Sequence, residues 1–485
     1  MDPANQPADV IANLSNSALR VRLAEIDSEI EKLQARVHRL QTTRKPIADA
    51  LDAIIYPILS LPVEITSEIF KQHLIQFFGS PSEADVLPFV DLARARDGGP
   101  FLLSHVCRAW RSIALNMPSL WSRVRVSSSD TDPSDWRELL QCWLARADSQ
   151  LLDLDLTAGF DQNQTTRLFS TVAPYSSQWR SFQCYWTDPF SIPIDIIRSR
   201  IPHLCELKVW SKTEDVSPGS PEIPLITAFF DAPNLRKVAL KYLPPKSISL
   251  HWAQLTHLDL DGQTVPQGIQ ALHQTPNLQQ LSIDLYGASG GAQPTPVVLR
   301  HVQNLSLPNV FDKVMRYLGY LTLPGVKTLY VYSIFQGRRN ATALLGMLEH
   351  SRSTVETMSM FCTSDFAILV LAYMDHASRL ELKPARWSSS HLAQFFARLT
   401  SDSKFLPNIR SIHILNYGAV IPYAELVSML TARFYNRQAN EAKLESFHLI
   451  RSSGEVDESP SLGVEDSLRG LRNAGLDIQI KRLNK

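Results

Sequence analysis

The sequence contains no uninterrupted run of about 18 apolar residues, the length that a helix needs to cross a bilayer. Its first segment, MDPANQPADVIANLSNSALR, has neither a basic stretch nor an apolar core, so it does not resemble a secretory signal. We therefore expect no membrane partner and a cytoplasmic and/or nuclear location, without secretion.

An excess of charge of either sign is also missing. Lys and Arg together number 48, as do Asp and Glu, and no basic block is longer than a few residues. Partners such as nucleic acids usually require a basic stripe or patch. We therefore expect no nucleic-acid partner. With 44% hydrophobic and 20% charged residues, the composition is that of an ordinary globular protein.

Cysteine is scarce, and its placement argues against disulfides and metal sites. The five cysteines are widely separated and form no C-x-x-C pair, and no Cys/His cluster has the spacing of a metal site. The sequence also contains no H-E-x-x-H, G-x-S-x-G, Walker-type loop or G-x-G-x-x-G. We expect reduced, buried thiols, no metal, no cofactor and no catalytic residues.

A heptad pattern follows a polar start (1–16) that we expect to be disordered. Its apolar residues alternate in steps of four and three: Leu19, Leu23, Ile26, Ile30, Leu33, Val37 and Leu40. This spacing predicts a coiled-coil-like helix within 17–58, although Pro46 interrupts the pattern. Two alternatives stay open: self-association through residues 19–40, or a helix that folds back on its own chain.

Two short amphipathic segments come next. LPVEITSEIFKQHL (61–74) has Pro62 where a first helical turn would begin. A second helix is expected from Phe101 to about Asn116, within LSHVCRAWRSIALNMPSLW (103–121). A unit of about 65 residues buries little apolar surface, so we expect it to lean on a partner or on the next domain.

The joint motif L-P-x-E-I (61–65), V-C-R-x-W-R (106–111) and L-W (120–121) resembles an F-box, in a version similar to the F-box proteins of mushroom-forming fungi. The resemblance places the F-box at 59–125, with an inserted loop at about 79–99. It implies docking on the Skp1 adaptor, and through Skp1 on a cullin ligase. The Skp1-binding residues would be Leu61, Pro62, Ile65, Ile69, Val106, Cys107 and Trp110.

Two other interpretations of the same segment are weaker. Cys107 as a nucleophile would need a base within reach, and His105, two residues away on a helix, points to another face. The second interpretation is that the apolar residues of this segment pack into a hydrophobic core of their own and bind no partner.

A repeated L-x-x-L-x-L pattern occupies residues 151–485, after a linker helix at 126–150. Its middle position recurs at intervals of 20 to 35 residues: Phe182, Leu207, Val238, Leu258, Leu281, Leu305, Leu329, Met358, Leu380, Ile412 and Phe447. LLDLDL (151–156) is a candidate first strand. Pro and Asn often precede the strands, as expected for turns. The pattern predicts a divergent leucine-rich-repeat solenoid of parallel strands with helices.

Residues that flank each middle position should point to the concave face of such a solenoid. Exposed aromatic residues commonly anchor protein interfaces. The candidate target-binding residues are Trp210, Tyr330, Tyr332, Phe361, His257 and Asp259.

The expected fold is therefore α/β: an N-terminal heptad helix, a small all-α F-box-like unit and a leucine-rich-repeat solenoid. The resemblance to leucine-rich-repeat F-box proteins implies the substrate-recognition subunit of an SCF-type ubiquitin ligase, with an unknown target protein on the repeat arc. The alternative is a non-ligase interaction scaffold whose F-box-like unit caps the repeats. Partial exposure of Leu61, Pro62 and Trp110 would favour docking, and their burial would favour the cap.

Overall fold

The computed structural model describes residues 15–52, 57–79, 87–126, 133–156, 162–186, 193–211, 225–286, 294–308, 315–333, 338–352, 354–416, 418–435, 442–451 and 460–482. The chain forms two units, Met1–Ile69 and Phe70–Lys485, which are described separately below. Most of the N-terminal segment expected to be disordered (1–16) lies outside the described residues.

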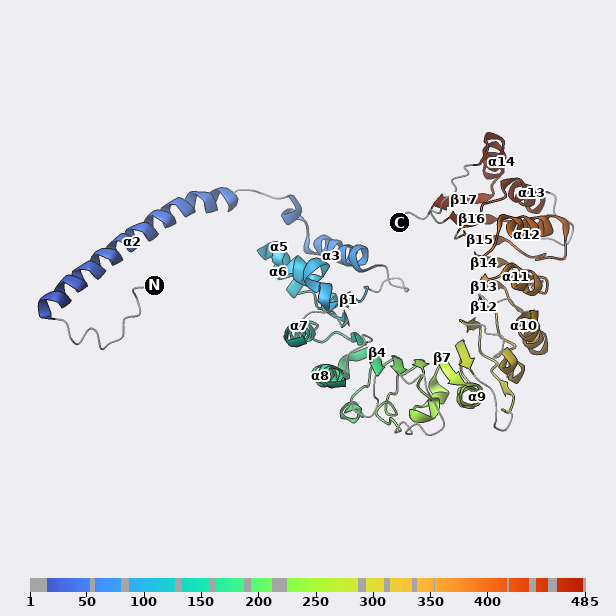
Figure 1. Cartoon of the computed structure of the whole chain (residues 1–485), viewed down its shortest axis with the longest axis horizontal. Helices are drawn as coiled ribbons and strands as arrows, with labels where there is room; N and C mark the ends of the chain where they lie inside the picture. Colours follow the sequence, from blue (N-terminus) through green and yellow to red (C-terminus); the bar gives the residue numbers. More distant parts are fainter. Residues whose placement is uncertain are drawn as a thin grey trace. The chain divides into compact units, whose positions relative to one another are not determined.

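The first unit is dominated by one long helix, α2 (Asn16–Asp52) (Figure 1). Pro46 lies inside this helix, so Pro46 interrupts the apolar pattern but not the helix itself. Main-chain carbonyls of the preceding turns also receive hydroxyl hydrogen bonds, from Thr42 to His38 and from Thr43 to Arg39, each at 2.9 Å. Among the described residues, no helix is both long and apolar enough to cross a membrane.

Short helices make up the region that resembles an F-box. They are α3 (Val63–Phe78), α4 (Ala95–Gly98), α5 (Pro100–Val106) and α6 (Arg108–Leu115), with 3₁₀ turns at Pro57–Ser60, Leu92–Arg94 and Pro118–Trp121. The boundary between the two units falls inside α3.

The single helix expected over 101–116 is wrong, because the helix is broken at Cys107. The backbone of Cys107 is extended (φ −156°, ψ 172°), and its sulfur accepts a hydrogen bond from the backbone N–H of Trp110 at 3.4 Å. Cys107 therefore caps α6, as a short polar side chain does at other helix N-termini.

Fifteen strands of the second unit form one parallel sheet in the described part of the chain (Figure 1). They are β1 (Val90–Asp91), β2 (Arg123–Arg125), β3 (Leu152–Leu156), β4 (Trp179–Trp186), β5 (Glu206–Ser211), β6 (Lys237–Lys241), β7 (His257–Thr264), β8 (Gln280–Tyr286), β10 (Asn304–Leu307), β12 (Thr328–Ser333), β13 (Thr357–Cys362), β14 (Arg379–Pro384), β15 (Ser411–Asn416), β16 (Ser446–Arg451) and β17 (Asp477–Arg482). A separate pair joins β9 (Val297–Val298) to β11 (Leu321–Thr322).

The predicted middle positions form one continuous row across this sheet. Phe182 pairs in register with Leu207, Leu207 with Val238, and so on to Ile412 and Phe447. All eleven side chains are buried. A buried apolar residue at the same place in every strand holds the register, because a one-residue slip would expose it.

The candidate first strand at 151–156 is not the first. β1 and β2 precede it, with Val90 paired to Val124 and Val124 to Leu154. β1 comes from the segment expected to be an inserted loop of the F-box, and the sheet therefore begins inside the F-box-like region. At the other end β17 adds Ile478 beside Phe447.

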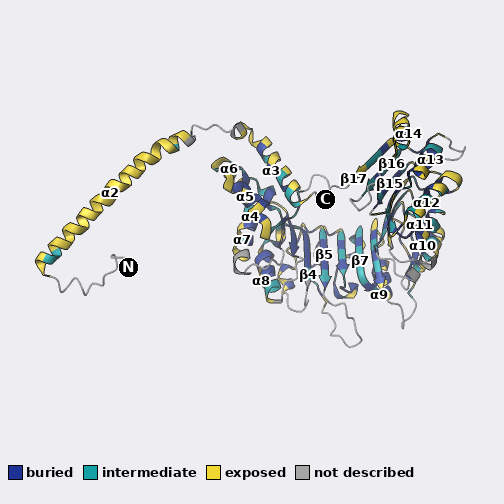
Figure 2. Cartoon of the chain, turned by 45° about the horizontal axis from the view of Figure 1, so that its top comes forward, coloured by how far each residue is buried: buried dark blue, intermediate teal, exposed yellow. Residues whose placement is uncertain are grey.

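Helices cover one face of the bent sheet in the second unit (Figures 1 and 2). They are α7 (Pro133–Arg146), α8 (Gln162–Val172), α9 (Val265–His273), α10 (Arg338–Ser351), α11 (Ser364–Leu371), α12 (Ser389–Ser401), α13 (Tyr423–Phe434) and α14 (Leu462–Asn473). The core lies between these helices and the sheet. The opposite face carries the alternate strand residues, such as Glu206, Lys208 and Trp210 of β5, and is called the open face below.

Candidate functional site

The candidate docking residues of the first unit are exposed. Leu61 and Ile69 are exposed, and half of the Ile65 side chain (50%) is accessible to solvent. Pro62 is also exposed and immediately precedes α3, where its fixed φ suits the start of a helix. Exposed branched side chains on one short helix cost free energy unless a partner covers them.

The candidate docking residues of the second unit lie around the break between α5 and α6. Val106 is 55% exposed, whereas Cys107 and Trp110 are half-buried. The Trp110 ring packs edge-on against Phe70, with the ring centroids 5.0 Å apart. Leu102 and Leu115 are exposed too, although sequence analysis did not select them.

The buried side of α5 is anchored to the sheet. Phe101 packs against Trp121 and Trp143, whose ring centroids lie 4.9 Å from each other. The indole N–H of Trp143 donates to the carbonyl of Trp121 at 2.7 Å, and that of Trp121 donates to the carbonyl of Ala114 at 2.9 Å. The guanidinium of Arg146 stacks over Trp121 at 4.7 Å. α5 therefore has one face in the core and one in solvent.

Two buried carboxylates, Asp153 and Asp155, form ion pairs that link the first strands next to this cluster. The Asp153 carboxylate accepts two hydrogen bonds from Arg180, at 2.5 and 2.9 Å, and forms an ion pair with Arg123 at 2.8 Å. Asp155 pairs with Arg125 at 2.6 Å. The Arg123 guanidinium also lies 4.3 Å from the ring of Phe89, which ties β1 to the sheet. These carboxylates are structural, because each is occupied by arginine.

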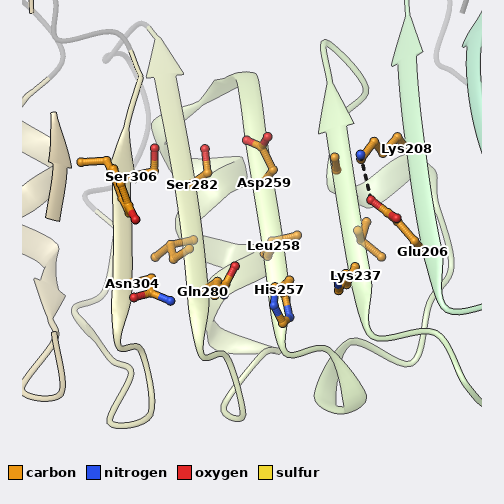
Figure 3. Close-up of a pocket in the computed structure, with 14 residues that line it drawn as sticks. Glu206, Lys208, Lys237, His257, Leu258, Asp259, Gln280, Ser282, Asn304 and Ser306 are labelled. Atoms are coloured by element: carbon orange, nitrogen blue, oxygen red, sulfur yellow. Dashed lines mark ion pairs between the residues drawn. The ribbon is translucent and has the colours of Figure 1, made fainter. Parts of the chain in front are cut away.

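A hollow on the open face crosses β5 to β12 (Figure 3). Its volume is about 330 Å³, and its lining includes His257, Asp259, Ser282, Ser306 and Tyr330. Lys208, Ala239 and Asp259 are register neighbours on three adjacent strands. The hollow exists because Ala239, Ser282 and Ser306 are short, while Lys208 and Tyr330 stand at its two ends. Ala239 was missed in the sequence, where its only signal is a small residue at an outward position.

Charges around the hollow are largely paired. Lys208 binds Glu206 at 2.8 Å, and Lys241 binds Asp261 at 2.7 Å, which raises the pKa of the Lys241 ammonium. Burial raises the pKa of the Asp259 carboxyl, although a hydrogen bond from Ser282 opposes this shift. The hollow therefore offers polar hydrogen-bonding groups rather than a strong net charge.

Only some of the candidate aromatic side chains on the open face contact one another. Tyr332 and Phe361, on adjacent strands, stack with ring centroids 4.5 Å apart. Tyr330 (46% exposed) and Tyr332 (43% exposed) are the most exposed residues of this group. Trp210 is half-buried, lies beside Tyr185 and Lys241, and does not line the hollow.

Several titratable groups elsewhere on the sheet have shifted pKa values. Burial raises the pKa of the Cys184 and Cys362 thiols, so both stay protonated and unreactive. Burial lowers the pKa of His413, whose ring packs edge-on to His448 at 5.9 Å. Within the described ranges, no group of three His, Cys, Asp or Glu side chains could hold a metal ion.

Residues 58–127 match the family model described as F-box-like. Searching the curated proteins found no similar sequence. The matched range holds α3 to α6 and also β1 and β2, so it overlaps the start of the sheet. An F-box-like domain implies Skp1 binding in general and suggests a substrate-recognition adaptor role in an SCF-type ligase; such domains are typically non-catalytic.

Proposed function

We propose that this protein is a substrate receptor of an SCF-type ubiquitin ligase, which docks on Skp1 through residues 61–115 and joins a cullin through Skp1. The observation that carries the proposal is that α5 has one buried side and one exposed side. Phe101 and Leu103 are buried, whereas Leu102 and Val106 are exposed. Ile65 of the first unit is exposed in the same way. A partner that covers these side chains would remove apolar surface from water.

The target protein is proposed to bind the open face, which we interpret as the concave face of a divergent leucine-rich-repeat domain. The regular register from β4 to β17 supports this interpretation. The stacked Tyr332 and Phe361 rings, with Tyr330, His257 and Asp259 around the hollow, supply the contacts. Holding a target near the transfer machinery raises its effective concentration and requires no bond chemistry from the receptor.

One observation favours the alternative, a repeat scaffold with an F-box-like cap. Trp121, near the end of the F-box-like region, is fully buried, and β1 extends the sheet; both features support a capping role. The two roles are compatible if the buried side of α5 serves as the cap and the exposed side binds Skp1. They differ in whether purified Skp1 binds at all.

Co-purification of the full chain with Skp1 tests the proposal. Wild type is expected to retain Skp1 in equal amounts, and Ile65→Asp or Val106→Asp should weaken binding at least about tenfold, because an interfacial charge without a partner must be desolvated. The matched control is Leu462→Asp, since Leu462 on α14 is a highly exposed leucine far along the chain.

All three positions are exposed, so each variant should keep the melting temperature of wild type. Absence of Skp1 from a folded wild-type preparation would refute the receptor role and leave the capped scaffold. Equal loss of binding in the Leu462→Asp control would refute the assignment of the docking residues.

A further inference from the structure

In the described structure, no other part of the chain buries the apolar side chains of the α2 heptad pattern. They form one row at steps of four and three residues, and six of the seven, from Leu23 to Leu40, are 44% to 63% exposed. A single helix gains nothing from such a row. A spacing of 3.5 residues keeps the row facing a partner helix when two helices supercoil.

We propose that the chain forms a parallel two-stranded coiled coil with a second copy of itself through residues 19–40. Leu23, Ile30 and Val37 occupy the a positions, and the remaining four residues of the row occupy d. β-Branched residues at two a positions and Leu at most d positions are the arrangement that favours parallel dimers.

The flanking charges complement a second copy. In a parallel pair Arg22 at g faces Asp27 at e of the other helix, and symmetry repeats this contact. Glu29 and Arg36 at g face glutamines at e, so no like charges meet. Within one chain Arg22 contacts Glu25 at 3.0 Å, and both are more than half exposed. Because exposed ion pairs contribute little free energy, Arg22 can leave Glu25 and pair with Asp27 of the second copy at little cost in stability.

In the antiparallel orientation, one residue of the apolar row has no apolar partner. An antiparallel pair that aligns a with d over residues 23–40 places Leu19 opposite Arg44. It leaves Asp27 opposite Gln34 and Arg22 opposite Thr43, although it pairs Glu29 with Arg36. Each orientation therefore offers one symmetry-repeated pair of opposite charges, and the parallel arrangement is favoured because it buries all seven apolar residues.

Dimerisation does not rest on Skp1 docking, and it adds a property to the receptor. Each particle would carry two F-box-like domains and two open faces. A target with two binding segments, or a target that is itself a dimer, would then bind bivalently and with higher avidity than a single face allows.

The mass of the full chain in solution, measured by light scattering after gel filtration, tests the proposal. Wild type should have twice the mass of one 54.5 kDa chain. Ile30→Glu should have the mass of one chain, because the change puts a charge into an a layer while retaining a good helix former. Ala35→Glu is the matched control on an exposed f position of the same helix and should remain dimeric.

A charge exchange tests the orientation. Arg22→Glu should weaken the dimer about tenfold, because it turns two attractive contacts into repulsive ones. Arg22→Glu combined with Asp27→Arg should restore it. A monomeric wild type at all micromolar concentrations would overturn the proposal, as would a dimer that survives Ile30→Glu. Insensitivity to Arg22→Glu would overturn the parallel arrangement. Loss of Skp1 binding leaves these outcomes unchanged.

Discussion

At the scale of single residues, polar groups that the fold buries are mostly paired. Arg433 on α13 is buried, and its guanidinium donates to the carbonyls of Leu399 and Phe405 at 2.6 and 2.7 Å. His413 differs, because its Nε2 is buried and accepts or donates no hydrogen bond in the described structure. His413 faces Glu381, Lys383 and His448, and burial keeps the pKa of its ring below the usual value of 6.5.

Because of His413, the free energy of unfolding should depend on pH. The unfolded chain binds a proton at about pH 6.5, where the folded chain does not. The contribution of His413 to stability should therefore be constant above about pH 7 and be lost as the pH drops from there towards the lower pKa of the folded state. Urea titrations at several pH values measure this slope.

His413→Asn should flatten the slope, while His376→Asn, at an exposed histidine, serves as the control. An unchanged slope in His413→Asn would show that this ring does not titrate with folding.

At the scale of the elements, the sequence pattern predicts all but three strands of the large sheet, and it does not predict the separate pair β9 and β11. β1 and β2 follow the same pattern, with Leu87, Val90 and Leu92 in one and Trp121, Val124 and Val126 in the other. Both lie inside the range expected for the F-box (59–125), β1 in its inserted loop (about 79–99) and β2 at its end, so neither is predicted as a strand. When residues of the F-box-like region also form strands of the sheet, the two sequence patterns overlap and do not show that the sheet begins there.

β17 was missed for another reason. Its pattern has Gly475 where the other strands have an apolar first residue, and Gly475 adopts a positive φ of 101° in the turn after α14. The break at Cys107 was also missed, since the apolar spacing continues across it. The alternation of the open face could be predicted, whereas the hollow could not, because it depends on short residues of several strands meeting in register.

The Phe101, Trp121 and Trp143 cluster should determine how firmly α5 is held on the sheet. Trp143→Ala should destabilise this region by about 3–5 kcal/mol, since it empties a fully buried site and removes the hydrogen bond to Trp121. Tyr373→Ala, at a highly exposed ring on the same chain, should change stability by less than about 0.5 kcal/mol.

Hydrogen exchange would locate the effect of Trp143→Ala. Faster exchange in α5, β2 and β3 is expected, with β13 to β16 unaffected, because each strand of such a sheet contacts mainly its neighbours. Uniform acceleration along the chain would contradict a local role, and a loss below about 1 kcal/mol would contradict the anchoring itself.

At the scale of the whole molecule, separate surfaces are proposed to have separate tasks. Exposed apolar residues of α3, α5 and α6 are proposed to bind Skp1, the open face to bind a target, and α2 to bind a second copy. Within the second unit, the continuous strand register and the buried cluster around Trp143 connect α5 to the sheet that carries the open face. None of the proposed tasks requires bond chemistry.

The central claim is that the F-box-like region of this chain docks on Skp1. Hydrogen exchange of the full chain, with and without purified Skp1, tests it most directly. We expect slower exchange in α3, α5 and α6 on addition of Skp1, with β5 to β13 unchanged. Exchange that Skp1 leaves unchanged throughout, or protection confined to the open face, would contradict the account.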